Sequence, residues 1–327
     1  MLRAQDSQDI LYIGGQPIQR GEESKIIFDI ARLPTHTELG LPVYVYRAEK
    51  AGPVLLITAT IHGDEVNGLE IIRRMMKSKT IRPEKGTVIA VPIVNAYGFL
   101  FFSRHLPDGK DLNRSFPGSK RGSLARQIAY LLMEEVLPHA DYGIDLHTGG
   151  ARRHNYPQVR SDFEDPESIV LAAAFSPPLI VASTPIDKTF RKEAAIRKKP
   201  ILVYEAGETL RLNEMAVQEG IDGILRTMHF LGMIDSAPQP NQSIWIRKRR
   251  WIRASEAGFF HSSMQTGSYV TKNQYLGFLS DPYGNFENQI HAPANGYILG
   301  INNMPVVHKG DALFHLGQEE SYDATEP

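Results

Sequence analysis

Two histidines and one glutamate stand where short apolar runs end, and these are residue types that bind a catalytic metal. His62 and Glu65 lie three residues apart, after the apolar run 54–60 and before a helical stretch. His147 follows a second apolar run. In an open α/β sheet, ligands bind outside the carboxyl ends of the strands. Two histidines and one carboxylate with an open fourth position are typical of catalytic Zn²⁺, so we predict a zinc site here.

Two further carboxylates are spaced to support this site. Asp145 lies two residues before His147, so the two side chains share one face of a regular strand. A metal-bound histidine needs a partner on its other ring nitrogen, and Asp145 can supply it. Glu205 follows the apolar run 201–203, and a partly desolvated carboxylate at this edge can accept a proton from the attacking water. Glu208, three residues later, is predicted to be solvated.

A loop rich in hydrogen-bond donors, the donor loop, precedes the motif that contains His147. It contains Asn113 and Arg114, and Arg104 stands nine residues before Asn113. The planar guanidinium group matches a carboxylate, and an adjacent asparagine adds a donor. Near a metal, these three residues would anchor a substrate. Without that context, the same residues fit a surface loop with ordinary salt bridges, just as His62 and Glu65 alone fit a loop histidine and a helix-start glutamate.

The elements that must position these residues alternate between buried strands and amphipathic helices. Residues 10–47 are predicted to form antiparallel strands. The further strands are expected at 54–60, 87–94, 142–146 and 200–204, and the helices at 66–79, 124–137 and 212–231. This alternation is typical of an α/β fold with a mixed sheet flanked by helices.

The composition changes near residues 236–241, which read as a linker, and short strands dominate beyond it. We therefore predict a catalytic domain at 1–240, with an N-terminal β segment at about 10–47, and a β-rich domain at 241–327. Gly258, Val270 and Leu276 can be aligned with Gly296, Val307 and Leu313 at an offset of 37 or 38 residues. Two similar halves predict a small barrel or sandwich. It resembles the biotinyl/lipoyl hammerhead fold, but it lacks the Met-Lys-Met carrier motif, which favours a lid or oligomerisation module.

Charge and composition exclude several classes of function. The 327 residues carry 36 Lys and Arg against 37 Asp and Glu, so no global field attracts nucleic acid. The absence of cysteine excludes disulfide scaffolds, cysteine zinc sites and thiol nucleophiles. The N-terminal residues lack the apolar core of a signal peptide, and the apolar stretch 88–102 is too short to span a membrane. We expect a cytoplasmic protein with a small-molecule partner, no nucleic acid and no membrane; a homo-oligomer is left open.

Four motifs occur in a fixed order: H-G-x-E at 62–65, D-L-N-R-x-F-P-G at 111–118, D-L-H-T-G at 145–149 and E-x-G-E at 205–208. Together they resemble the succinylglutamate desuccinylase/aspartoacylase family, which shares the fold of the zinc carboxypeptidases. The resemblance covers roughly residues 50–235. It implies that His62, Glu65 and His147 bind one Zn²⁺ per chain. It also implies that Glu205 is the general base and later the proton donor.

The same resemblance implies further roles for the donor loop. Asn113 and Arg114 would grip a substrate carboxylate, and Arg104 would polarise the scissile carbonyl. Asp111 would hydrogen-bond to His62. This sequence has Asp64 where the family commonly has Asn, a change that should be tolerated. Its gap between Arg104 and Asn113 is slightly longer than in some relatives. Residues 152–157 are expected to line the pocket.

The expected activity is the hydrolysis of the amide bond of an N-acyl amino acid, which releases a carboxylic acid and a free amine. One alternative is a metallocarboxypeptidase-like peptidase; in resembling deacylases, a C-terminal module narrows access and excludes peptides. A second alternative is a non-catalytic zinc protein that binds partners, which would be favoured if Glu205 lay far from the metal ligands. The metal motifs identify neither the acyl group nor the amino acid.

Overall fold

The structure is a computed structural model that describes residues 10–319. Most of the N-terminal stretch in which we expected no signal peptide lies outside this range. Among residues 10–319, none of the helices has the length and apolar character needed to cross a membrane.

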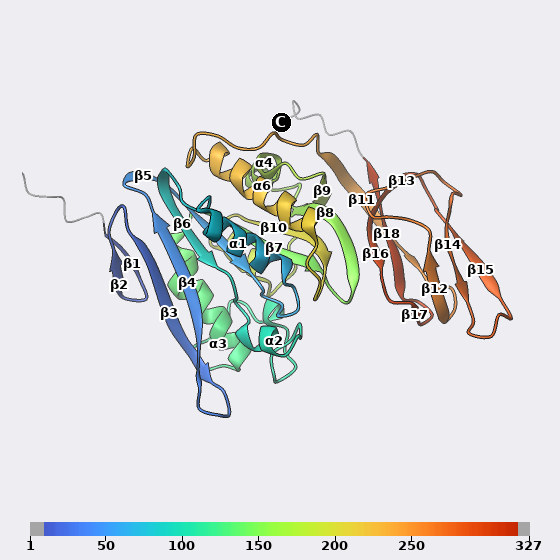
Figure 1. Ribbon diagram of the computed structural model, residues 1–327, viewed down its shortest axis with the longest axis horizontal. Coiled ribbons are helices and arrows are strands. Elements are labelled where there is room, and N and C mark those ends of the chain that lie inside the picture. The colour runs from blue at the N-terminus through green and yellow to red at the C-terminus, as the bar shows by residue number, and fades with distance from the viewer. Residues whose placement is uncertain (1–9, 320–327) are drawn as a thin grey trace, which may run out of the picture.

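A twelve-stranded mixed sheet runs through the molecule, with helices on both faces (Figure 1). In spatial order its strands are β13 (Tyr269–Val270), β16 (Gly296–Asn302), β18 (Ala312–Glu319), β11 (Ile244–Arg253), β9 (Leu179–Ala182), β8 (Arg153–Ser161), β10 (Ile201–Glu208), β7 (Tyr142–Gly149), β5 (Lys50–Ala59), β6 (Lys85–Val91), β4 (Glu38–Arg47) and β3 (Glu23–Arg32). A separate hairpin joins β1 (Leu11–Ile13) and β2 (Gln16–Ile18). The sheet and its helices confirm the predicted fold class.

The central strands are parallel, which explains their continuous apolar sequences. Strand β5 pairs in parallel with both β6 and β7, and β7 pairs in parallel with β10. Strands buried on both faces need apolar residues at every position. Because these three pairings run the same way, the carboxyl ends of β5, β7 and β10 meet at one edge, where the predicted site residues lie.

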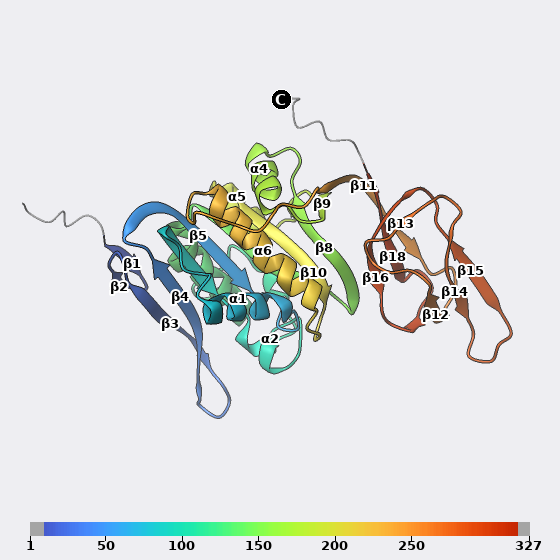
Figure 2. The same cartoon turned by 45° about the horizontal axis from the view of Figure 1, so that its top comes forward.

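Two helical layers cover the sheet. One contains α1 (Asn67–Ser78), α4 (Pro166–Phe175) and α6 (Glu214–Phe230), and their apolar residues pack against Leu146 and Tyr204 of the central strands. The other contains α2 (Ala96–Leu100), α3 (Leu124–Leu131) and α5 (Phe190–Ile196). Figures 1 and 2 both show α1 and α6 lying side by side across one face. Successive side chains of a strand point to opposite faces of the sheet, so the odd-numbered residues of β7 and β10 lie on the face away from α1 and α6.

Several predicted boundaries differ from the structure. The stretch predicted as one helix at 124–137 is α3 followed by a π-helical segment, Leu132–Val136, and a short 3-10 helix, Leu137–His139. Strands β7 and β10 extend beyond 146 and 204 to Gly149 and Glu208, since they continue through the polar site residues. Strands β8 and β9 and helices α4 and α5 were not predicted from the sequence.

The C-terminal region is all β, as predicted. Its second sheet has four strands in the order β15 (Glu287–His291), β14 (Tyr275–Ser280), β12 (Gly258–Ser262) and β17 (Val306–Val307). The internal repeat aligns β12, β13 and β14 with β16, β17 and β18. The short strand of each half pairs with the first strand of the other half: β13 pairs with β16, and β17 pairs with β12. Both halves thus contribute to a shared core around Phe260 and Phe314.

The main sheet continues past residue 240, where we placed the domain boundary. Strand β11 pairs in parallel with β9 of the α/β part, and β16 pairs antiparallel with β8. The buried side chains of Leu179, Val181, Ile246 and Leu299 join the two parts. The division at 240 stays a prediction.

Candidate active site

The predicted metal ligands converge at the carboxyl edge of the sheet. His62 lies in the turn after β5, Glu65 lies just before α1, and His147 lies in β7. One ligand atom from each lies within 4.8 Å of the other two, and all three residues are buried. The turn depends on Gly63, because a Cβ there would lie 1.9 Å from the carbonyl carbon of Gly98. At position 63, only glycine fits without moving the backbone.

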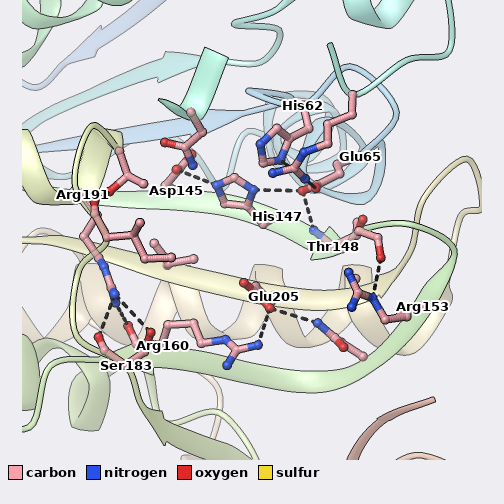
Figure 3. A pocket seen from close by; sticks show the side chains of 18 of the residues that line it. His62, Glu65, Asp145, His147, Thr148, Arg153, Arg160, Ser183, Arg191 and Glu205 are labelled. Atoms are coloured by element: carbon pink, nitrogen blue, oxygen red, sulfur yellow. Dashed lines mark hydrogen bonds and ion pairs between the residues drawn. The ribbon is translucent and has the colours of Figure 1, made fainter. Parts of the chain in front are cut away.

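The donor atoms suit a divalent cation. The Nδ1 atoms of His62 and His147 lie 2.7 and 2.9 Å from the two carboxylate oxygens of Glu65. Figure 3 shows the two rings turned toward that carboxylate. The backbone N–H of Thr148 also donates to Glu65, at 2.9 Å. Two imidazole nitrogens and a carboxylate around one point match the ligand types that zinc prefers.

Two more carboxylates hold the outer nitrogens of the histidines. Asp111 Oδ1 lies 3.2 Å from His62 Nε2, and Asp145 Oδ2 lies 2.7 Å from His147 Nε2. The hydroxyl of Thr58 donates to Asp145 at 2.8 Å. With Nε2–H donating to a carboxylate, each ring keeps its Nδ1 lone pair for a metal. Burial lowers the pKa of His147, but the charges of Asp145 and Glu65 outweigh it and raise that pKa well above its ordinary value. The site therefore favours positive charge.

Arg104 lies directly beside these ligands. Its Nε and Nη2 atoms donate to Asp111 Oδ2 at 3.1 and 2.9 Å, and its Nη1 lies 3.5 Å from Glu65 Oε1. Asp111 therefore holds His62 with one oxygen and Arg104 with the other. The structure thus brings Arg104 to the predicted metal ligands.

Asn113 and Arg114 lie in a short 3-10 helix, Leu112–Arg114, at the wall of the pocket. Asn113 Oδ1 accepts a hydrogen bond from the backbone N–H of Phe190, at 2.9 Å. This bond fixes the amide orientation and leaves its NH₂ group as the donor for a ligand. Arg114 is exposed and donates to the carbonyl of Asn113 at 2.6 Å.

Glu205 lies beside the candidate metal ligands. Strand β10 places it next to His147 of β7 on one side and Gln158 of β8 on the other. Its Oε2 accepts from Arg160 Nη2 at 2.9 Å and from Asn155 Nδ2 at 3.0 Å. Burial raises the pKa of Glu205, but the charge and hydrogen bond of Arg160 outweigh burial and lower that pKa below its ordinary value. The carboxylate is therefore ionised at neutral pH.

These residues line a cavity of about 320 Å³, within the usual range for small-molecule sites. The sequence did not identify Arg160, Arg191, Arg249 or Trp251, which also line it. Trp251 stacks on His315 at 4.2 Å between ring centroids, and the Arg153 guanidinium lies 5.2 Å from its centroid. Neither Arg249 nor Trp251 belongs to a motif; they reach the pocket because β11 continues the main sheet.

One expectation for a neighbouring residue needs correction. Glu208 is not solvated: it is buried, and its Oε2 accepts from Asn303 Nδ2 at 2.6 Å. This contact ties the end of β10 to the C-terminal region. Within 152–157, which we expected to line the pocket, Arg153 and Asn155 do so. His154 instead accepts a hydrogen bond from Asn213 Nδ2 at its Nε2, at 3.2 Å, and its Nδ1 lies 3.0 Å from Thr266 Oγ1.

Comparisons with known proteins find relatives in sequence and in fold. A deacetylase of N-alpha-acetyl-L-2,4-diaminobutyric acid from Halomonas elongata is 27% identical over 257 residues, which cover 74% of each chain. The crystal structure of a succinylglutamate desuccinylase/aspartoacylase from Rhodobacter sphaeroides superposes with a TM-score of 0.81 at 26% identity, covering 92% of this chain and 97% of the other. The product-bound ectoine utilization protein of Ruegeria pomeroyi shares the fold, with a TM-score of 0.79 at 21% identity and coverage of 90% and 94%.

The catalytic-domain profile of succinylglutamate desuccinylases and aspartoacylases matches residues 51–231. This segment spans more than half of the chain and includes His62, Glu65, His147, Glu205 and the donor loop. The chain therefore belongs to the succinylglutamate desuccinylase/aspartoacylase family.

Proposed function

We propose that this protein is a zinc-dependent deacylase that hydrolyses the amide bond of an N-acyl amino acid. The observation that carries the proposal is the position of Glu205, which lies beside His147 in the pocket that also contains His62, Glu65 and Arg104. The second alternative, a non-catalytic zinc protein, would be favoured if Glu205 lay far from these residues.

The proposed cofactor is one Zn²⁺ per chain, held by His62, Glu65 and His147. When bound, zinc acts as a Lewis acid and lowers the pKa of water. Asp111 and Asp145 orient the two imidazoles through their outer nitrogens. These two contacts keep the Nδ1 atoms of both histidines directed toward the proposed zinc position.

Glu205 has two roles in the proposed reaction. As an ionised carboxylate, it accepts a proton from the water that attacks the amide carbonyl. The same carboxyl group then donates this proton to the leaving amine, so that a carboxylic acid and a free amine are released. Arg104, fixed by Asp111, donates to the oxygen on which negative charge develops.

The donor loop orients the substrate. The NH₂ group of Asn113 and the guanidinium of Arg114 bind the carboxylate of the amino acid, which places the amide bond near Glu205. The peptidase alternative requires space for a chain that extends out of the pocket. Arg249 and Trp251 of the C-terminal region line this pocket of about 320 Å³, and its small volume supports a small substrate.

A panel of substrates tests this function. Zinc-loaded protein is incubated with N-acetyl, N-succinyl and N-formyl amino acids and with short peptides, and free amine release is measured. We expect cleavage of an N-acyl amino acid that stops on zinc removal by a chelator and returns when zinc is added. Cleavage of peptides alone would favour the carboxypeptidase-like alternative. Turnover that survives complete zinc removal would contradict the proposal.

A further inference from the structure

A second cavity, which we call the basic groove, adjoins the active-site pocket. It lies between the donor loop, the start of α3 and the start of α5, and its volume is about 700 Å³, against about 320 Å³ for the pocket. Four cationic and two acidic side chains line it: Lys110, Arg114, Arg126 and Lys188, with Asp111 and Glu193. Arg114 also lines the pocket, so the two cavities share one wall residue.

The two carboxylates of the basic groove differ in how far they are engaged. Asp111 is committed to the active site, because one of its oxygens accepts from Arg104 and the other lies 3.2 Å from His62 Nε2. Glu193 lies in the first turn of α5, and no ion pair is found for it among residues 10–319. Glu193 is therefore the lining carboxylate that remains to offset the cations.

Three of the four cations have no carboxylate partner within the described range. Lys110 forms an ion pair with Asp108, at 3.2 Å. Arg114 donates to a neutral backbone carbonyl, at 2.6 Å. For the exposed side chains of Arg126 and Lys188, no hydrogen bond or ion pair is found among residues 10–319. The basic groove therefore keeps an excess of positive charge that the proposed reaction does not use.

These three cations come from separate elements that converge on the basic groove. Arg114 lies in the 3-10 helix of the donor loop, Arg126 in α3, and Lys188 in the loop before α5. The N-cap residue of α3, Ser123, also lines the groove, so the positive end of the α3 dipole adds to the potential there. A concave surface lined by charges of one sign concentrates ions of the other sign. A compact anion with several charges can contact all three cations at once, whereas a monovalent anion cannot.

Arg114 connects the basic groove to the substrate. Its side chain is exposed, and the contact with a backbone carbonyl leaves most of its guanidinium donors free. In the proposed reaction this guanidinium binds the carboxylate of the substrate from the pocket side. An anion in the basic groove would draw the same guanidinium to the other side. Two ligands that need one group weaken each other by the same factor.

We propose that the basic groove is a binding site for a small polyanion, either a polycarboxylate or a polyphosphate, and that this polyanion competes with the substrate for Arg114. The competition rests on the proposed deacylase function, whereas the binding site itself does not. Arg126 and Lys188 would hold the polyanion without contacting the substrate, because neither lines the active-site pocket.

Binding of rigid trianions tests the site. Calorimetric titration of the zinc-loaded protein compares benzene-1,3,5-tricarboxylate with cyclic trimetaphosphate at constant ionic strength, and benzoate is the monovalent control. The rigid frames hold the anionic groups apart, which disfavours chelation of zinc. We expect at least one trianion to bind at least about tenfold more tightly than benzoate, and the tighter trianion identifies the kind of anion. If neither binds more tightly than benzoate, the site is wrong.

Variants assign the binding to the basic groove. Arg126→Met and Lys188→Met each remove one groove charge, and each should weaken trianion binding at least about fivefold. Arg121→Met is the matched control, since it removes the same charge from an exposed side chain in the loop before α3 that does not line the groove. It should change the affinity by less than about twofold. Equal losses in Arg121→Met and Arg126→Met would indicate a diffuse effect of net charge and overturn the site.

Kinetics test the competition separately. With the best N-acyl amino acid, the trianion should raise KM and leave kcat unchanged in the wild-type protein. Arg126→Met should keep the basal kcat and need at least about fivefold more trianion for the same rise in KM. A wild-type KM that does not respond to saturating trianion would overturn the competition for Arg114. If no substrate is cleaved, the deacylase function fails, while trianion binding that is weakened in Arg126→Met and not in Arg121→Met would still support the site.

Discussion

Asp111 shows how one side chain can position two functional groups. One of its oxygens lies 3.2 Å from His62 Nε2, and the other accepts two hydrogen bonds from Arg104. Burial raises the pKa of Asp111, but the hydrogen bond and charge of His62 outweigh it and hold that pKa far below its usual range. The residue is thus a permanent anion that fixes the orientation of both partners.

Replacing this anion should weaken zinc binding. Asp111→Asn keeps the shape of the side chain but removes the charge, so we expect zinc affinity to fall about 10-fold to 100-fold, as is usual for partners of metal-bound histidines. Competition with a chromogenic chelator measures the affinity. Asp108→Asn is the control, because Asp108 lies in the same loop and forms an ion pair with Lys110 at the surface. Equal zinc affinity in both variants would contradict the role of Asp111.

His315 should make the protein sensitive to mild acid. Burial, and then the charges of Arg160, Arg249 and Arg153, lowers its pKa from 6.5 to about 2. The stability contributed by the neutral ring is therefore fully present above the unfolded pKa of 6.5, and it is lost as the pH falls below that value, because only the unfolded chain takes up the proton. Between pH 7.5 and 5.5 this loss is about 1.4 kcal/mol.

Urea denaturation at these two pH values tests the effect. His315→Phe keeps a ring that can stack on Trp251 but cannot titrate. The pH-dependent loss of unfolding free energy should be about 1.4 kcal/mol smaller in the variant than in the wild-type protein. The same pH dependence in both proteins would show that His315 is not held neutral.

The sequence brings candidate site residues together where they lie in short motifs, and their roles stay predictions. His62, Glu65, His147 and Glu205 each follow a short apolar run, so local sequence places them at one sheet edge. Arg160 could not be predicted, because it reaches Glu205 through the pairing of β8 with β10, and the two residues are 45 positions apart. Arg249 likewise depends on a pairing between distant strands.

At the scale of elements, the turn between β5 and α1 sets the geometry of the metal site. Gly63 packs against the backbone of residues 98 and 99 so closely that no Cβ can be accommodated. This contact positions His62 and Glu65 on either side of the turn. The backbone, rather than a side chain, therefore determines the distance between these two ligands.

Gly63→Ala should disrupt zinc binding and lower stability, because the methyl group would displace either the turn or α2. Zinc content by atomic absorption and the urea midpoint are the measurements. Asp64→Asn is the control in the same turn: it leaves the backbone unchanged and introduces the residue that is common in the family, so both quantities should stay near those of the wild type. A Gly63→Ala protein that retains full zinc content would show that the close contact is not required.

Strand limits were the least predictable property of the elements. The apolar runs of β7 and β10 stop at Leu146 and Tyr204, but hydrogen bonding continues through His147 and Glu205. Functional polar residues at strand ends interrupt the hydrophobic pattern without ending the strand. Strand β8 was not predicted, because its pocket-facing arginines and asparagine, together with Pro157, are not typical of a buried strand.

At the scale of the whole molecule, the sheet crosses the predicted domain boundary. Strand β11 covers the edge of β9, and Ile246 and Leu299 are buried with Leu179 and Val181. The composition change near residue 240 marks a loop, but it does not reveal that the next strand rejoins the sheet. The β-rich region therefore completes both the core and the wall of the pocket.

A chain that ends at residue 240 should not fold into a soluble protein. It would expose the edge of β9 together with its apolar side chains, and exposed edges of this kind promote aggregation. Expression of residues 1–240 beside the full chain, followed by size-exclusion chromatography and circular dichroism, tests this expectation. A monodisperse fragment with a cooperative unfolding transition would support an independent domain at 1–240.

The central claim is that Glu205 transfers the proton in amide hydrolysis at a zinc site. The most direct measurement is kcat for the best N-acyl amino acid with zinc-loaded wild-type protein and with Glu205→Gln, together with the zinc content of both. We predict one zinc per chain in each protein and a loss of kcat of at least about 100-fold in the variant. A Glu205→Gln protein that contains zinc and keeps near wild-type kcat would contradict the account.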